Sequence, residues 1–108
     1  MTQIVDPIDF AAKLIRCPSI TPADVGALDV LQTQLESLGF VCTRYPFGTD
    51  ADEGARVDNL YARLGAAAPN FCFAGHTDVV PVGQADGWDV DPFGGHVIDG
   101  ILWGRGAA

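Results

Sequence analysis

The chain has 108 residues, 48% hydrophobic and 19% charged, which are typical values for a folded globular domain and not for a disordered segment. Fourteen acidic residues against six basic ones give a net charge of −8, which argues against nucleic acid as a partner. We also expect neither a membrane span nor a signal peptide, because no apolar run approaches about 18 residues and the start lacks a basic stretch.

Two helices are predicted in the amino-terminal part. Asp6 can cap the first helix, and Pro7 suits its first position. Pro18 ends this helix, because the residue before a proline is driven away from helical geometry. Thr21 followed by Pro22 repeats the start signal for the second helix, which Gly39 stops. The expected apolar faces are Ile8, Ala11, Ala12 and Ile15 in the first helix and Leu28, Leu31, Leu35 and Leu38 in the second.

From residue 40 onward the pattern changes from helical to extended. Residues 40–45 and 59–64 are predicted strands, with an acidic loop over residues 48–55 between them. Residues 71–75 form the most apolar run and are the expected centre of the sheet. Because residues 65–70 are too few to hold a crossover helix, we expect the strands on either side of them to run antiparallel.

The rest of the chain is rich in glycine and proline, which are typical of loops and turns. Residues 79–95 predict a long loop over the strand end. Its larger side chains are expected to anchor the loop by burial, in preference to lining a substrate cleft; they are Trp88, Pro92 and Phe93. Asp99–Gly100 is a two-residue hairpin signal between short strands at residues 96–98 and 101–103.

Three cysteines, Cys17, Cys42 and Cys72, are odd in number and lie far apart, with no Cys-x-x-Cys spacing. This pattern is not that of a disulfide framework or a thiolate metal site. We expect buried free thiols and therefore a reducing, cytoplasmic location.

A histidine and a carboxylate stand two residues apart after the most apolar run. Side chains i and i+2 of an extended backbone point to the same side, so His76 and Asp78 are expected to lie together. A metal-bound imidazole commonly donates its other ring N–H to such a carboxylate, which fixes the tautomer. The same spacing also suits a purely structural hydrogen bond. His96 has no carboxylate at that spacing and is expected to face solvent.

Three motifs belong together. Residues 75–81 read Gly-His-Thr-Asp-Val-Val-Pro, residues 99–108 read Asp-Gly-Ile-Leu-Trp-Gly-Arg-Gly-Ala-Ala, and residues 18–22 read Pro-Ser-Ile-Thr-Pro. In combination they closely resemble the di-zinc aminoacylase and carboxypeptidase family of metallohydrolases. The resemblance implies an α/β fold, in which a mixed sheet is flanked by two amino-terminal helices. It also implies that His76 is a zinc ligand and that Asp78 is the catalytic aspartate hydrogen-bonded to it.

The activity that this resemblance implies is hydrolysis of the amide bond of a small N-acylated amino acid. Ala107–Ala108 favours N-succinyl-LL-2,6-diaminopimelate as the substrate, split into succinate and diaminopimelate for lysine and cell-wall synthesis. N-acetylornithine or another N-acyl amino acid is the alternative. The resemblance further implies two Zn²⁺ ions per complete subunit, with cobalt as an alternative metal, and a homodimeric complete enzyme.

The same family pattern implies that residues 1–108 are the amino-terminal part of a catalytic domain. A carboxylate bridging the two metals, a general-base glutamate, the remaining ligands and a lid and dimerisation domain would all follow Ala108. The chain alone is therefore expected to be inactive. A hypothesis of another class is that it is a non-catalytic truncated relic or a binding module.

Overall fold

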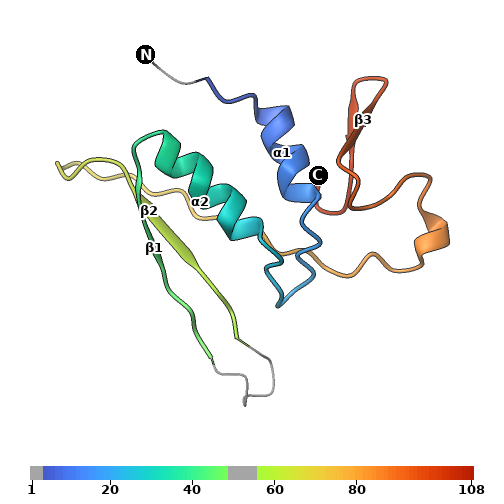
Figure 1. Ribbon diagram of the computed structural model, residues 1–108, viewed down its shortest axis with the longest axis horizontal. Coiled ribbons are helices and arrows are strands. Elements are labelled where there is room, and N and C mark those ends of the chain that lie inside the picture. The colour runs from blue at the N-terminus through green and yellow to red at the C-terminus, as the bar shows by residue number, and fades with distance from the viewer. Residues whose placement is uncertain (1–3, 49–55) are drawn as a thin grey trace.

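The structure is a computed structural model that describes residues 4–48 and 56–108, so most of the predicted acidic loop over residues 48–55 lies outside the described residues. Two helices are followed by two short antiparallel strand pairs (Figure 1). In chain order the elements are α1 (Pro7–Ile15), α2 (Ala27–Ser37), β1 (Val41–Arg44), β2 (Leu60–Arg63), the 3₁₀ turn η1 (Ala85–Gly87), β3 (His96–Ile98) and β4 (Ile101–Trp103). This content confirms the α/β class. Within the described ranges, no helix is long and apolar enough to cross a bilayer.

Helix α1 has the start that the sequence predicts. The Asp6 carboxylate accepts hydrogen bonds from the backbone N–H groups of Ile8, at 2.8 Å, and Asp9, at 3.3 Å. Pro7 occupies the first turn, where its missing N–H costs nothing. Ala12 and Ile15 on the inner face are buried, so this short helix supplies half of the apolar core.

Helix α2 begins later than predicted. The start at Thr21–Pro22 is wrong, because these two residues form a turn, in which the Ala23 N–H donates to the Ile20 carbonyl at 2.9 Å. The Thr21 N–H donates outside any helix, to the Val79 carbonyl at 2.9 Å. The helix starts at Ala27 instead, and the Asp24 carboxylate accepts from the Leu28 N–H at 2.9 Å.

The carboxyl end of α2 agrees with the prediction. Gly39 has a φ of 94°, a left-handed conformation that ends the helix. The Gly39 N–H donates to the Glu36 carbonyl and the Phe40 N–H to the Leu35 carbonyl, so both orphan acceptors are satisfied. The chain then enters β1 directly.

Strands β1 and β2 form one antiparallel pair, in which Val41 lies opposite Arg63. Helix α2 packs on this pair (Figure 1). Arg44 fastens the helix to the strands: its guanidinium bonds Asp29 of α2 at 2.5 Å and Asp58 just before β2 at 3.0 Å. The two predicted strands at residues 40–45 and 59–64 are therefore confirmed and are partners of each other.

The strand predicted over residues 71–75 is not formed. These residues run without a ladder partner in the described chain, and the Phe71 and Phe73 residues are 81% and 91% exposed. A run this apolar becomes a central strand only when neighbours pair with both its edges, and the described strands pair elsewhere. The described sheets are accordingly two separate antiparallel pairs, and parallel pairing is limited to a single bridge between Ile20 and Val79.

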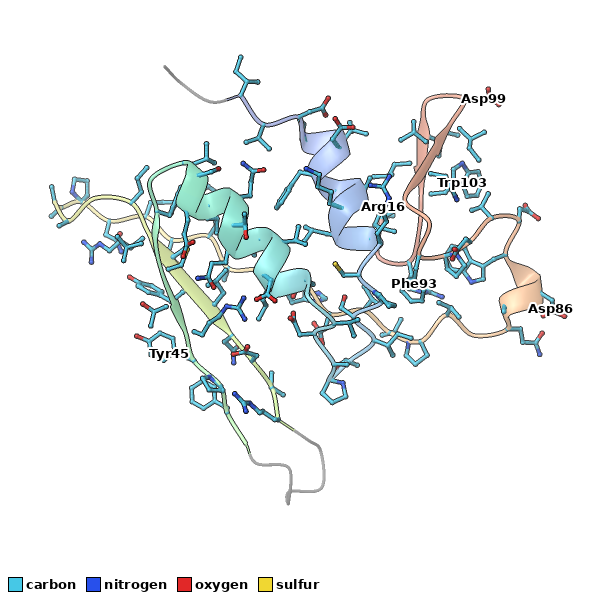
Figure 2. The ribbon with its side chains drawn as sticks, in the orientation of Figure 1. Arg16, Tyr45, Asp86, Phe93, Asp99 and Trp103 are labelled. Atoms are coloured by element: carbon cyan, nitrogen blue, oxygen red, sulfur yellow. The ribbon has the colours of Figure 1, made fainter. Side chains whose placement is uncertain are left out.

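The β3–β4 hairpin forms at the predicted turn. Asp99 and Gly100 have φ values of 51° and 78°, as a two-residue turn with both central residues left-handed requires. Figure 2 shows Asp99 at the tip of this hairpin and Arg16 at the end of α1. The hairpin reaches α1 through glycine: a Cβ built on Gly104 would lie 2.5 Å from Ile15 Cγ2.

The loop over residues 79–95 is anchored by Trp88. Its indole N–H donates to the Val82 carbonyl at 2.9 Å, and the Arg105 guanidinium carbon lies 5.0 Å from its ring centroid. Trp88 is partly buried, which agrees with the predicted anchoring. The loop therefore follows a defined path from the Asp78 region to β3.

Candidate metal site

His76 and Asp78 lie on the extended segment that leads into the Ile20–Val79 bridge. The two side chains are in contact, as their spacing predicts, with His76 Nδ1 2.8 Å from Asp78 Oδ1. The same ring nitrogen is 2.9 Å from the Asp78 main-chain oxygen. The His76 side chain is 82% exposed and that of Asp78 is 45% exposed, so the pair is open to a ligand.

Both neighbours of His76 Nδ1 are oxygen acceptors, so this nitrogen carries the hydrogen and donates it. In the neutral ring, Nε2 then keeps its lone pair, which is the form that binds a metal. The pKa of His76 is raised, first by its hydrogen bond to the Asp78 carboxylate, then by its hydrogen bond to the Asp78 main-chain oxygen, and last by the negative charge of Asp78. Hydrogen bonding from the Thr21 side chain and then from His76 lowers the pKa of Asp78.

Ser19 is hydrogen-bonded to this segment at two points. Its hydroxyl donates to the Thr77 carbonyl at 2.8 Å, and its own carbonyl accepts from the Val79 N–H at 2.9 Å. Ser19 is 2% exposed and is the buried polar residue of the described chain. The sequence analysis does not predict this role: the Pro-Ser-Ile-Thr-Pro motif at residues 18–22 supports only the family resemblance there, and its Thr21–Pro22 part is interpreted as a helix start.

Two of the motifs that carry the family resemblance, at residues 75–81 and 99–108, lie in contact here. A Cβ built on Gly106, whose φ is 81°, would lie 2.8 Å from Val79 Cγ1. The Gly-Arg-Gly stretch therefore passes directly against the residue after Asp78, and only glycine allows this approach. Two motifs far apart in the sequence belong to one locality of the fold.

His76 also shares a groove with apolar side chains. The groove has a volume of about 830 Å³, and its lining includes Thr21, Asp78, Leu31 of α2 and Phe71. His96, in contrast, lies exposed at the start of β3, as predicted.

The donor set fits part of a metal site. His76 offers one imidazole nitrogen, and Asp78 offers the outer carboxylate that such ligands use. A zinc ion takes three or four protein ligands. Across residues 4–48 and 56–108, no group of three or more His, Cys, Asp or Glu side chains comes together. The described chain supplies one ligand and its orienting partner, whose roles remain predictions.

The chain is similar to one protein-family model and to several named proteins. Residues 72–108, which include His76 and Asp78, match the model of "Peptidase family M20/M25/M40", whose members are generally metal-dependent. The chain is 68% identical over 103 residues to a protein of Rhodospirillum centenum named succinyl-diaminopimelate desuccinylase, covering 95% of this chain and 26% of that protein. Proteins of the same name from Maricaulis maris and Phenylobacterium zucineum are 59% and 52% identical, over 98% and 99% of this chain and 25% and 26% of theirs.

The chain thus spans about a quarter of the length of the curated relatives that it matches. The family match and the identities agree with the motifs at residues 18–22, 75–81 and 99–108. On these grounds the chain is similar to members of peptidase family M20/M25/M40.

Proposed function

We propose that the protein carrying this chain hydrolyses N-succinyl-LL-2,6-diaminopimelate to succinate and LL-2,6-diaminopimelate. The observation that carries the proposal is the His76–Asp78 contact of 2.8 Å inside the stretch that matches the family model. Relatives at 52–68% identity whose names specify this activity support the choice of substrate.

His76 is the metal ligand in this proposal, and Asp78 holds its ring. The Nδ1–H···Oδ1 hydrogen bond presents Nε2 outward, and the carboxylate charge raises the basicity of the ring. Zinc is the proposed metal, two ions per complete subunit, with cobalt as a substitute. When bound, the metal supplies a polarised substrate carbonyl and a water of lowered pKa.

Residues 1–108 form the amino-terminal part of the catalytic domain in this proposal, with the remaining ligands, the general base and a lid and dimerisation domain elsewhere in a homodimeric enzyme. The relatives support this division, because the chain covers only 25–26% of their length. We place the enzyme in the cytoplasm, because all three cysteines are free thiols. Their expected burial is wrong, since Cys17 and Cys42 are only partly buried and Cys72 is exposed.

Succinate release by the full-length protein tests the proposal, with N-acetylornithine as the competing substrate. We expect turnover of the succinyl substrate, loss of activity on chelation and recovery with Zn²⁺. His76→Ala should nearly abolish both zinc occupancy and turnover, because it removes a metal ligand. His96→Ala is the matched control and should change neither. Equal losses from the two substitutions with the fold intact, or a preference for N-acetylornithine, would refute the assignment.

A further inference from the structure

The Pro-Ser-Ile-Thr-Pro motif has no role in the function proposed so far, yet it contacts the candidate site through buried groups. Ile20 pairs with Val79 in a parallel bridge, so residues 19–21 lie opposite residues 78–80. Three hydrogen bonds of 2.8–2.9 Å connect the two segments. Contacts between segments so far apart in the sequence fix the position of one relative to the other.

Ser19 holds both peptide groups that flank Asp78. The carbonyl of Thr77 belongs to the peptide before Asp78 and accepts from the Ser19 hydroxyl. The N–H of Val79 belongs to the peptide after Asp78 and donates to the Ser19 carbonyl. With both peptide planes fixed, the Cα–Cβ direction of Asp78 is fixed as well.

We propose that Ser19 is a positioning residue, which clamps the backbone on both sides of Asp78 and so holds its carboxylate against His76. The inference rests on the proposed metal-ligand role of His76. Thr21 helps to hold the same segment. Its N–H donates to the Val79 carbonyl, and its side chain hydrogen-bonds the Asp78 carboxylate. A carboxylate that is held in place keeps the imidazole in one tautomer and orientation, which an exposed ring could not maintain alone.

Ser19→Ala in the full-length protein is the direct test. It removes the hydroxyl bond to Thr77 and leaves the chain length and the Val79 bond unchanged. We expect kcat and zinc affinity to fall by about 10 to 100-fold, as for other partners that act on a metal ligand from outside. KM should change far less, since Ser19 does not contact substrate in this proposal.

Ser37→Ala is the matched control. The Ser37 hydroxyl also donates to a backbone carbonyl, that of Gln34 at 2.6 Å, but it lies on α2 outside the clamp. This variant should keep the parental kcat and zinc affinity. Parental values in a folded Ser19→Ala protein would overturn the proposal.

A double-mutant cycle separates positioning from general stability. If Ser19 acts through Asp78, Ser19→Ala should cost much less in an Asp78→Asn background than in the parent. The same loss factor in both backgrounds would mean a merely structural role and would overturn the proposal. If Ser19→Ala does not fold, Thr21→Val takes its place in the cycle, with Thr21→Ser expected to restore activity.

A readout without metal or substrate distinguishes failure of the clamp from failure of the proposed function. Imidazole nitrogen chemical shifts of the metal-free full-length protein report the His76 tautomer at a pH where the ring is neutral. The parent should show the Nδ1–H form, and Ser19→Ala a mixture of both forms. An unchanged tautomer would overturn the clamp, whatever His76→Ala does to zinc binding in the full-length protein.

Discussion

At the scale of single residues, His76 and Asp78 are the proposed metal ligand and its orienting partner. The ring is almost fully exposed, so its orientation depends on the 2.8 Å bond to Asp78 and not on burial. Loss of the carboxylate charge should therefore matter more for reactivity than for folding.

Asp78→Asn tests this in the full-length protein. The amide oxygen can still accept from Nδ1–H, so the fold and much of the zinc should remain. The charge that favours one tautomer is gone, so the rate on N-succinyl-diaminopimelate should fall by about 10 to 100-fold, further than the zinc content. Zinc per subunit and turnover, measured on the same samples, check this. Full activity would reduce Asp78 to a structural residue.

The pH dependence of zinc binding has a definite sign. The pKa of His76 is raised, so the stabilising contact of imidazolium with carboxylate is fully present below the ordinary histidine value of about 6.5 and is lost as pH rises through the raised value. The same contact is also lost at low pH, when the pH falls through the lowered pKa of Asp78 and its carboxylate is protonated. Zinc needs the neutral ring, so affinity should increase as pH rises through the His76 value.

Asp78→Asn removes the main cause of the raised pKa of His76. The rise of zinc affinity should then occur at a lower pH than in the parent. Zinc titrations of both proteins across a pH series would check the direction of this shift. A rise at the same pH in both would contradict it.

The sequence could predict the His76–Asp78 contact because the two residues are local neighbours on an extended backbone. It could not predict Ser19, whose partner Thr77 lies 58 positions away. A buried serine hydroxyl bonded to a distant carbonyl leaves no periodicity or spacing to detect. Only the motif at residues 18–22 pointed to something specific there.

At the scale of elements, the correct predictions are those whose signals act locally. Three signals that act within a few residues are found as predicted: the Asp6 cap of α1, the Gly39 stop of α2 and the Asp99–Gly100 hairpin turn. Thr21 failed as a helix cap because its N–H is engaged by Val79, a tertiary contact. The run at residues 71–75 failed as a strand because ladder formation depends on partners, which local apolarity does not supply.

Gly39→Ala is expected to destabilise the chain by about 1 kcal/mol, the cost of a side chain at left-handed φ. Space is not the cause, since the new Cβ would lie 3.7 Å from Leu64 Cδ1, an ordinary contact. Gly87→Ala is the matched control, in open space and without a positive φ, and should cause no loss. Urea unfolding followed by circular dichroism checks both variants. Equal effects would contradict the conformational explanation.

At the scale of the whole molecule, the apolar core is small and one apolar face is open. The buried hydrophobic residues among those described are Ala12, Ile15, Ala27 and Leu28. Phe71 and Phe73 are exposed beside the groove of about 830 Å³, which no described segment fills. Of the leucines predicted on a buried face of the second helix, Leu28 is buried and Leu31 and Leu35 are half-buried. Leu38 lies after the end of α2 and is 37% exposed, so its predicted burial is wrong.

The 108-residue chain should bind zinc weakly, because one imidazole and its orienting carboxylate fall short of the three or four ligands that zinc takes. Calorimetric titration with Zn²⁺ checks this, and His76→Ala should weaken the residual binding further. A tight stoichiometric complex that is lost in His76→Ala and retained in His96→Ala would mean that the chain builds a complete site by itself.

The Ser19–Thr77 bond also has a meaning for the order of folding. Closing a loop of 58 positions costs more chain entropy than a helical turn or a two-residue hairpin does. We therefore expect α1 and the β3–β4 hairpin to appear first and the surroundings of Asp78 to settle among the last. Until then His76 is an exposed imidazole without a fixed orientation. The fold is then completed and the orientation of the His76 ring fixed in the same step.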